Sequence, residues 1–327
     1  MTDRAMWTSS NAAVASVSAS GVASPLTAGT STITATFAGM SGTTQVTVSS
    51  PTMLMTDISS PSSIDVFDAY QEGNTAPSRA INGALTTLST VWGIQVYKDE
   101  IYVTDANSSI DVFPTSASGN VAPVRRINGA LTGITSGAYG LAVYNDEIYV
   151  TTPSKILVFP KSATGNISPT RTITGPTTTI GTNTYELAVY KDEIYLSNYT
   201  QVLVFPAMGN GDIAPTRTIA GPHAQLQNCY GIVVANDEIW VSNLSGIRVF
   251  VSSATGDATP IRNITGPSTA IQSATGVALL GDELYVTDAS NFGTFVFAKE
   301  ATGDVVPKRS LSGSATTIVN ARHVAFF

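Results

Sequence analysis

Pairs of neighbouring carboxylates are the residues of this sequence that could most readily perform acid–base chemistry or bind a metal ion. An Asp-Glu pair recurs at intervals of 45 to 47 residues, at Asp99/Glu100, Asp146/Glu147, Asp192/Glu193, Asp237/Glu238 and Asp282/Glu283. A single active site needs one such pair. A repeated hairpin, by contrast, needs a turn in every copy, and Asp is a common turn residue. We therefore interpret the five pairs as structural.

Other reactive side chains are scarce. The chain has two histidines, His223 and His323, which leave little for general acid–base catalysis near neutral pH. The single cysteine, Cys229, allows no internal disulfide and is expected to be a buried spectator. The sequence also lacks the motifs of serine hydrolases, zinc proteases and nucleotide-binding loops. We expect no catalytic residue, no bound metal and no cofactor.

A calcium site is a further possibility at one turn, where oxygen-bearing side chains alternate. They are Asp105, Asn107, Ser109 and Asp111. A calcium loop of EF-hand type also needs a central glycine and a terminal bidentate Glu, and this segment has neither. We expect the first of these positions to fix the following turn instead, by bonding the backbone two residues on. In the six copies it is Asp57, Asp105, Thr152, Asn198, Asn243 and Asp288.

Positions at which the repeat is broken are more informative about binding. The residue before each first strand is Trp92, Tyr139, Tyr185, Tyr230, Thr275 or Arg322, and the next residue is Gly in four copies but Glu186 and His323 in two. In a ring of six copies these residues would lie at one mouth of the central channel, with Glu186 and His323 opposite each other. An aromatic rim with two ionisable groups could bind a sugar or an extended peptide. The candidate ligand-binding residues are therefore Trp92, Tyr139, Tyr185, Glu186, Tyr230 and His323. The alternative is that the aromatic rings only cap the core between blades.

The elements that must position these residues follow from the repeated unit, for which residues 139–176 serve as the example. Four short β-rich runs are separated by turn residues, and the first two flank Asn145-Asp146 as in a tight hairpin. The runs are residues 140–144, 147–151, 155–159 and 169–174. A period near 45 residues, rich in Val, Ile, Thr and Tyr and without helical spacing, predicts a β-propeller with four-stranded antiparallel blades.

The number of blades follows from two motifs that occur six times each. They are the Val-Phe of the third strand and the P-x-R before the fourth, with Arg79, Arg125, Arg171, Arg217, Arg262 and Arg309. The Asp-Glu hairpin occurs only five times, but residues 53–57 align with the second strand and residues 323–327 with the first. We therefore predict six blades, the last closed by the C-terminal strand, which removes exposed edges. The arginines could pair with the Asp-Glu carboxylates, and exposed pairs of this kind contribute about 0 to 1 kcal/mol.

The unit resembles the NHL repeats of six-bladed β-propellers. The matching features are a glycine before a hydrophobic pair, the IYVTD run at residues 101–105 and the IDVF run at residues 110–113. The resemblance covers residues 53–327, and we assign residues 51–327 to the propeller. It implies the fold but says little about function, because propellers include both binding modules and enzymes.

Residues 1–50 are of a different kind and resemble the C-terminal part of a bacterial Ig-like domain of group 2 (Big_2). We expect four strands, around Trp7 and at residues 13–17, 32–37 and 43–48, whereas a complete sandwich needs about seven. The missing part leaves three alternatives. The chain could be a fragment of a longer protein, a neighbouring subunit could complete the sandwich with a strand, or the half-domain could pack on the propeller.

Composition limits the class of partner. A net charge of -7 argues against a nucleic-acid partner, which would need clustered Lys and Arg. Charged residues make up 12% of the chain, which is typical of a secreted or surface β-protein. No apolar run approaches 18 residues, so we expect no membrane insertion. No signal peptide opens the sequence, so an exported precursor would begin upstream.

Together these observations favour a non-catalytic, extracellular or cell-surface bacterial module that binds or scaffolds a protein or carbohydrate ligand through one propeller face. Two alternatives remain open. One is a lactonase-like or lyase-like enzyme that uses the central channel. The other is a structural polymer whose subunits are linked by strand donation.

Overall fold

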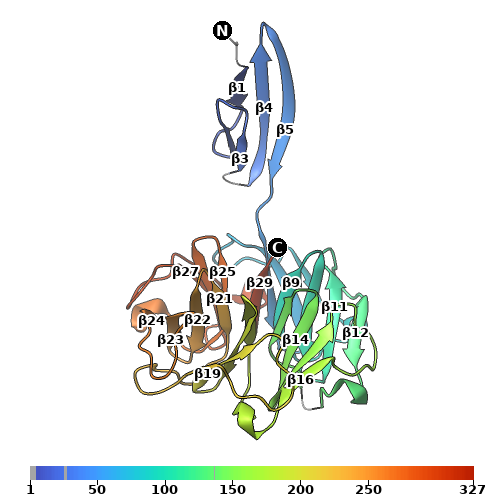
Figure 1. Ribbon diagram of the computed structural model, residues 1–327. Coiled ribbons are helices and arrows are strands. Elements are labelled where there is room, and N and C mark those ends of the chain that lie inside the picture. The colour runs from blue at the N-terminus through green and yellow to red at the C-terminus, as the bar shows by residue number, and fades with distance from the viewer. Residues whose placement is uncertain (1–4, 26–27, 136) are drawn as a thin grey trace. The chain divides into compact units, whose positions relative to one another are not determined.

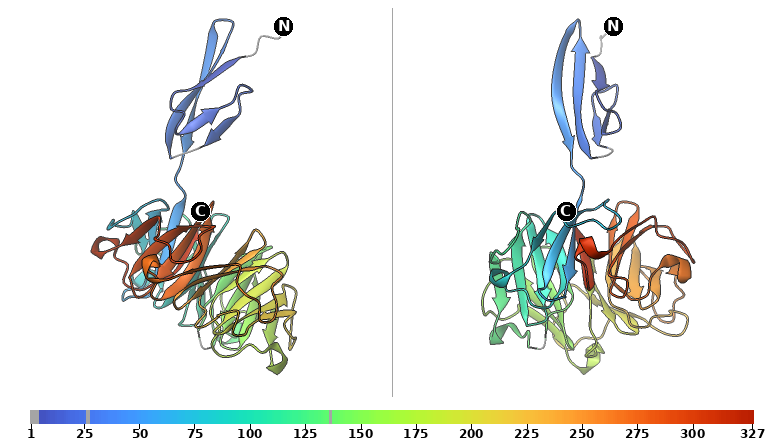
Figure 2. Two further views of the ribbon diagram at one scale, coloured as in Figure 1. Left: turned by 90° about the vertical axis from the view of Figure 1, so that its left-hand side faces the viewer. Right: turned by 180° about the vertical axis from the view of Figure 1, so that it is seen from behind.

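The computed structural model describes residues 5–25, 28–135 and 137–327, which form mainly β-strands (Figures 1 and 2). Contacts divide the chain into two compact units. The smaller unit comprises Met1–Thr52 and Asp68–Tyr70, and the larger comprises Met53–Phe67 and Gln71–Phe327. Among the described residues, helices are limited to five short 3-10 turns, and none is long and apolar enough to cross a membrane.

The smaller unit contains a three-stranded sheet and a two-stranded sheet. The first has the order β1 (Met6–Ser9), β4 (Gly29–Phe37) and β5 (Met40–Val48), and the second pairs β2 (Ala15–Val17) with β3 (Ala23–Pro25). The expectation of four strands is therefore wrong, because β3 is an additional one. Its Ala-Ser-Pro sequence is exposed and lacks apolar alternation, so the pattern gave no signal for it.

The larger unit contains six four-stranded antiparallel sheets within the described residues. In the example unit the order is β13 (Leu141–Tyr144), β14 (Glu147–Thr152), β15 (Lys155–Pro160) and β16 (Arg171–Thr174). The predicted hairpin is confirmed, because Tyr144 pairs with Glu147 and the two residues between them have the positive φ angles of a tight turn.

The other complete copies follow the same order along the chain. They are β9 (Val91–Tyr97), β10 (Glu100–Asp105), β11 (Ser109–Pro114) and β12 (Arg125–Asn128); β17 (Leu187–Tyr190), β18 (Glu193–Asn198), β19 (Gln201–Pro206) and β20 (Arg217–Ile219); β21 (Ile232–Ala235), β22 (Glu238–Asn243), β23 (Gly246–Val251) and β24 (Arg262–Thr265); and β25 (Ala274–Leu280), β26 (Glu283–Asp288), β27 (Gly293–Ala298) and β28 (Arg309–Ser312). The 3-10 turns η1 (Ala84–Thr86), η2 (Ala130–Thr132), η3 (Pro176–Thr178), η4 (Pro267–Thr269) and η5 (Ser314–Thr316) follow outermost strands.

The sixth sheet joins the end of the chain to the start of the larger unit, as predicted. Its order is β29 (Ala321–Phe326), β6 (Thr52–Asp57), β7 (Ser63–Asp68) and β8 (Arg79–Ile81). In Figures 1 and 2 the red C-terminal strand lies beside blue strands of this unit. The innermost strands contact one another in the order β9, β13, β17, β21, β25 and β29, and β29 returns to β9. The contacts therefore form a closed cycle.

The core of the larger unit lies between neighbouring sheets. The phenylalanine that ends each Val-Phe motif is buried in all six copies, at Phe67, Phe113, Phe159, Phe205, Phe250 and Phe297. One apolar cluster joins Ile110 and Val112 of one sheet to Ile148, Val150 and Phe159 of the next. Each sheet therefore covers the apolar face of its neighbour, and no copy buries its core alone.

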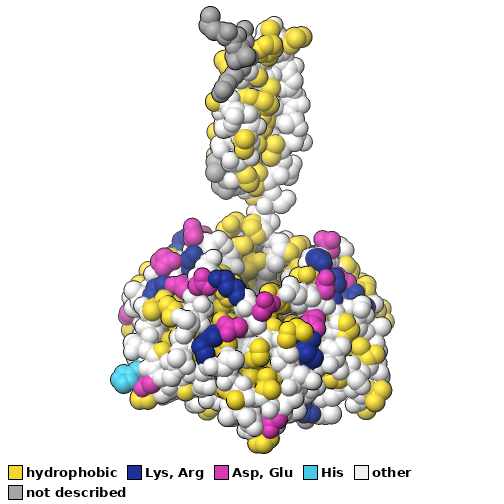
Figure 3. All heavy atoms as spheres, viewed as in Figure 1, with side chains coloured by type: hydrophobic (Ala, Val, Ile, Leu, Met, Phe, Trp, Pro, Cys, Tyr) yellow, Lys and Arg dark blue, Asp and Glu magenta, His cyan; other side chains and the backbone are white. Residues whose placement is uncertain are grey.

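Arginine–glutamate pairs hold the hairpin side of five sheets together. Arg262 donates from Nη1 and Nη2 to both oxygens of Glu238, at 2.8 and 2.7 Å, and the two side chains are only 14% and 19% exposed. The equivalent pairs are Arg125–Glu100, Arg171–Glu147, Arg217–Glu193 and Arg309–Glu283. These pairs are half-buried and bidentate, so each is stronger than the exposed pair that the sequence led us to expect. Figure 3 shows such groups of opposite charge side by side on the larger unit.

Candidate functional site

The six candidate residues line a single cavity, together with Thr275 and Arg322. Their rings pack on one another: Trp92 meets Tyr139 edge to face at 5.2 Å and stacks on Tyr185 at 6.4 Å, and Tyr185 and Tyr230 are 4.5 Å apart. The rings leave a space of about 20 Å³, which holds one or two water-sized groups. We call this cavity the mouth.

A ring of buried hydroxyl groups fixes the backbone around the mouth. Thr56 Oγ1 donates to the carbonyl of Trp92 at 2.7 Å and accepts a hydrogen bond from the backbone N–H of His323 at 3.0 Å. The second strand of every sheet repeats this bridge, with Thr56, Thr104, Thr151, Ser197, Ser242 and Thr287. The six carbonyls that accept from them belong to Trp92, Tyr139, Tyr185, Tyr230, Thr275 and Arg322. Each hydroxyl thus ties one sheet to the mouth residue of the next.

This hydroxyl ring was not predicted from the sequence. A signal was present, because a Thr or Ser stands at the same second-strand position in all six copies. Thr and Ser also occur commonly in strands without any such role, so the pattern alone did not predict the bridge.

Each Asp that follows one of these hydroxyls bonds the backbone two residues on, as predicted, and also bonds the loop that leads to a mouth residue. Asp105 accepts a hydrogen bond from the N–H of Asn107 at 2.8 Å, which fixes the turn. It also accepts one from the N–H of Ser89 at 2.6 Å, in the loop that leads to Trp92. Asp57 likewise accepts a hydrogen bond from the N–H of Val319, in the loop that leads to Arg322. These buried carboxylates therefore hold the loops that enter the mouth.

Glycine is required after most mouth residues because the backbones of neighbouring sheets approach closely there. A Cβ atom at Gly140 would lie 2.4 Å from the carbonyl oxygen of Tyr185. The N–H of Gly140 uses this approach to donate to that oxygen at 3.0 Å. At the two copies without glycine, the side chains of Glu186 and His323 enter the centre of the unit instead.

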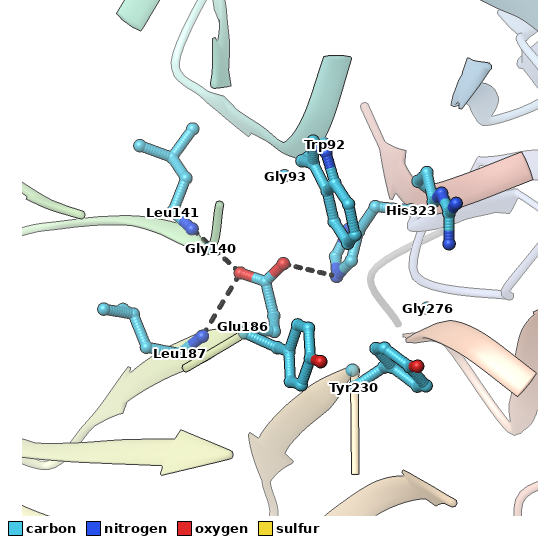
Figure 4. Close-up of polar contacts among 12 residues, drawn as sticks. Trp92, Gly93, Gly140, Leu141, Glu186, Leu187, Tyr230, Gly276 and His323 are labelled. Atoms are coloured by element: carbon cyan, nitrogen blue, oxygen red, sulfur yellow. Dashed lines mark hydrogen bonds and ion pairs between the residues drawn. The ribbon is translucent and has the colours of Figure 1, made fainter. Parts of the chain in front are cut away.

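Glu186 and His323 meet in the centre (Figure 4). The sequence placed them opposite each other, and the structure brings Glu186 Oε2 to 3.4 Å from His323 Nε2. Glu186 Oε1 accepts hydrogen bonds from the N–H groups of Leu141 and Leu187, at 2.9 and 3.3 Å. Burial raises the pKa of Glu186 to about 8 and lowers that of His323 to about 4. At neutral pH the carboxyl group is therefore protonated and the imidazole is neutral.

The same pair separates the mouth from the central channel. The channel is a second cavity of about 310 Å³, lined by the innermost strands, and it shares Glu186 and His323 with the mouth. Its other lining side chains are apolar except Gln95, whose Oε1 accepts the N–H of Val143. A group bound in the mouth would therefore touch Glu186 and His323 but would not enter the channel.

Other potentially reactive groups lie outside the mouth. Cys229 is buried, and burial raises the pKa of its thiol to about 12. His223 contacts Asp257 at 2.6 Å on the surface. In the parts of the chain that the structure describes, no three His, Cys, Asp or Glu side chains are grouped as a metal site needs. The mouth is thus the place where aromatic, hydroxyl and ionisable groups converge.

No protein-family model matches this sequence, and no curated protein is similar to it. Solved structures, however, share its fold. A chain from a nidogen/laminin complex has a TM-score of 0.61 at 11% identity, covering 84% of this chain and 98% of its own length. The WD40 β-propeller domain of Doa1 has a TM-score of 0.54 at 13% identity, covering 83% of this chain and 87% of its own length. The likeness identifies the repeated sheets of the larger unit as a β-propeller.

Proposed function

We propose that this protein is a non-catalytic module that binds a protein partner through the mouth side of a closed, six-bladed, NHL-like propeller. The observation that carries the proposal is the distribution of charge. The loops that lead into the innermost strands, and the turns between second and third strands, contain no Asp, Glu, Lys or Arg apart from the buried Glu186. We call them the mouth-side loops. The hairpin turns on the other side carry charges in each of the five Asp-Glu copies.

The mouth-side loops also expose large apolar side chains. Leu131 is 60% exposed and Phe292 is 51% exposed, and Leu85, Tyr199, Leu244 and Val319 are exposed as well. The charges on this side come from neighbouring segments, such as Asp212, Asp257 and Asp304, which bond to backbone N–H groups of the mouth-side loops. Exposed aromatic and aliphatic groups around a rigid centre are typical of the core of a protein interface. One structural neighbour comes from a complex of two proteins, nidogen and laminin, which fits this proposal.

A carbohydrate ligand in the mouth is less well supported. The packed rings leave about 20 Å³, which is too small for a sugar ring. An enzymatic role in the channel is also less well supported, because Glu186 and His323 are both neutral near pH 7 and lie 3.4 Å apart, and Glu186 accepts hydrogen bonds from the backbone.

We also propose that residues 1–50 are a partial Ig-like domain of the Big_2 type and that residues 51–327 form the propeller. We further propose that the protein acts outside a bacterial cell. The low fraction of charged residues and the abundance of Ser and Thr support an extracellular location. Cell fractionation with an antibody to the protein tests it, and a purely cytosolic signal would contradict it.

The test of binding compares variants on the two sides of the propeller. The intact protein is applied to arrays of extracellular proteins and of glycans, and each protein hit is measured again with Leu131→Lys, Phe292→Lys and Val251→Lys. Val251 is 43% exposed at the hairpin end of β23 and serves as the control. We expect the first two variants to lose binding and the third to keep it. Equal binding by all three, or binding to glycans alone, would contradict the proposal.

A further inference from the structure

Arg322 lies in the mouth without a counter-ion. Its guanidinium stacks on the ring of Trp92, 4.6 Å from the centroid, and its Nε has no hydrogen-bond partner. Among the described residues, no carboxylate lies within ion-pair distance of it. The other mouth residues are uncharged at neutral pH, including Glu186 and His323.

This situation differs from that of the arginines on the hairpin side. Five of those pair with a glutamate, and Arg79 donates to the carbonyls of Thr115 and Ala117. A charged side chain that is partly removed from water without an ionic partner costs free energy, and this partial burial lowers the pKa of Arg322. An anion that enters the mouth would offset this cost.

Few groups near Arg322 would repel an anion. The mouth-side loops contain no carboxyl group apart from that of Glu186, which is protonated at neutral pH. The buried carboxylate of Asp57 acts on Arg322, and its oxygens already accept hydrogen bonds from the N–H groups of Val319 and Asn320. The mouth therefore has a positive centre. The carboxylates of Asp212, Asp257 and Asp304 lie on the outer parts of the mouth-side loops, where they accept hydrogen bonds from backbone N–H groups, and they do not line the mouth.

The size and shape of the mouth limit the anion. The space of about 20 Å³ admits a group of a few atoms. A carboxylate is planar and matches the donor fork of a guanidinium. The hydroxyl groups of Tyr185 and Tyr230, whose rings line the same space, can donate further hydrogen bonds.

We propose that the mouth receives one carboxylate of the protein partner, held by Arg322 and the tyrosine hydroxyls. This proposal rests on the proposed function, and it names the group that anchors the partner. The exposed apolar residues of the mouth-side loops would surround that anchor, as neighbouring contacts surround the buried centre of an interface. The carboxylate belongs to an Asp or Glu side chain or to a chain end.

The experiment uses small carboxylates and therefore does not need the partner. The intact protein is labelled with ¹⁵N, and the indole N–H resonances of its three tryptophans are followed during titration with sodium acetate. Sodium chloride at equal ionic strength is the reference. Trp240 is fully buried and Trp7 belongs to the smaller unit, so only the Trp92 resonance should shift. We expect saturation in the millimolar range, because few atoms make contact.

Variants show whether Arg322 is responsible. In Arg322→Gln we expect the affinity for acetate to fall roughly tenfold or more, because the charged hydrogen bonds are lost. Arg248→Gln is the control, since Arg248 is a buried arginine that lies on β23 and does not line the mouth. Its titration should match that of the unchanged protein. Unshifted Trp7 and Trp240 resonances in Arg322→Gln before acetate is added show that the variant is folded.

Three further probes identify the source of the carboxylate: N-acetylglycine for a chain end, N-acetylaspartate α-amide for a side chain, and methyl glucuronide for an acidic glycan. Tighter binding of either amino-acid derivative supports a protein source, and tighter binding of the glucuronide overturns it. Absence of a saturable shift, or an equal shift in Arg322→Gln, overturns the carboxylate site. Neither result affects the variants on the mouth-side loops, so the proposed function is tested separately.

Discussion

At the scale of single residues, the two departures from glycine define the centre of the larger unit. Glu186 and His323 occupy positions where four other copies keep a glycine that touches the next sheet. Their side chains enter the space between mouth and channel, where burial favours their neutral forms. The neutral forms of these two side chains should therefore affect how the stability of the protein depends on pH.

We expect Glu186→Gln to change how stability depends on pH. The folded pKa of Glu186 is about 8, above the ordinary value of 4.5. Between these values the unfolded chain releases a proton that the folded protein keeps. The contribution of Glu186 is therefore full below pH 4.5 and falls as pH rises to 8, by at most about 1.4 kcal/mol per pH unit. Urea unfolding at a series of pH values measures it, and the variant should lack this fall.

The matched variant His323→Gln should change the pH dependence of stability in the opposite direction, because His323 loses its contribution as the pH falls. The folded pKa of His323 is about 4, below the ordinary 6.5, so its contribution falls as pH drops from 6.5 to 4. Asp65 and Asp111, whose pKa values burial raises to about 6, affect all three proteins alike. If the curves of the unchanged protein and Glu186→Gln run parallel from pH 4.5 to 8, the protonated carboxyl group is excluded.

At the scale of elements, strand ends and close backbone contacts hold the copies together. The C-terminal strand β29 pairs with β6, and Phe326 packs on Tyr285 of the preceding sheet at 4.7 Å. The hydroxyl bridges and glycine contacts repeat this joining at every pair of sheets. Each junction is local, but loss of one opens the cycle.

Removal of residues 324–327 should therefore destabilise the protein strongly. The deletion takes away buried Val324 and Ala325 and leaves β6 with an unpaired edge. We expect the melting temperature to fall by about 10 °C or more. Removal of Phe327 alone, which is 44% exposed, is the control and should have little effect. An unchanged melting temperature after the longer deletion would mean that the C-terminal strand does not close the cycle.

The glycine contacts give a second prediction at this scale. In Gly140→Ala the new methyl group meets the Tyr185 carbonyl, so the two backbones must separate, at a cost of about 1 to 3 kcal/mol. Gly181→Ala is the matched control, because its methyl group would meet only Asn198 Oδ1, at 3.8 Å. Chemical denaturation measures both variants. Equal stability of the two would contradict the close approach.

At the scale of the whole molecule, the two units differ in how they complete their cores. The larger unit closes on itself through β29 and β6. The smaller unit has three strands in one sheet and two in the other. Its described residues include few buried apolar side chains: Val14, Ala15, Ile33 and Ala69. A neighbouring chain could add a strand to such a unit.

We expect the protein to be monomeric at micromolar concentration. In that case no neighbouring chain donates a strand to the smaller unit. Size-exclusion chromatography with light scattering over a range of concentrations measures this. A mass that rises with concentration, or filaments under the electron microscope, would instead favour strand donation between subunits. Deletion of residues 1–50 should then abolish the assembly.

Much of the architecture followed from the sequence. The Asp-Glu spacing located the hairpins, the six Val-Phe motifs located the third strands, and the alignment of residues 53–57 and 323–327 with missing strands predicted the joining of the ends. These features are local or repeated, so each is read from neighbouring residues. The short strand β3 was missed because three exposed residues carry no periodic signal.

The sequence by itself also determined which positions depart from the repeat, and so it named the residues that meet in the mouth. Only the tertiary structure decided what they do there. It showed that the aromatic rings pack on one another until about 20 Å³ remains, that Glu186 lies 3.4 Å from His323, and that no carboxylate among the described residues forms an ion pair with Arg322. The physical reason is that packing density, burial and charge pairing depend on distances between residues far apart in the chain, and these distances are fixed only when the sheets assemble.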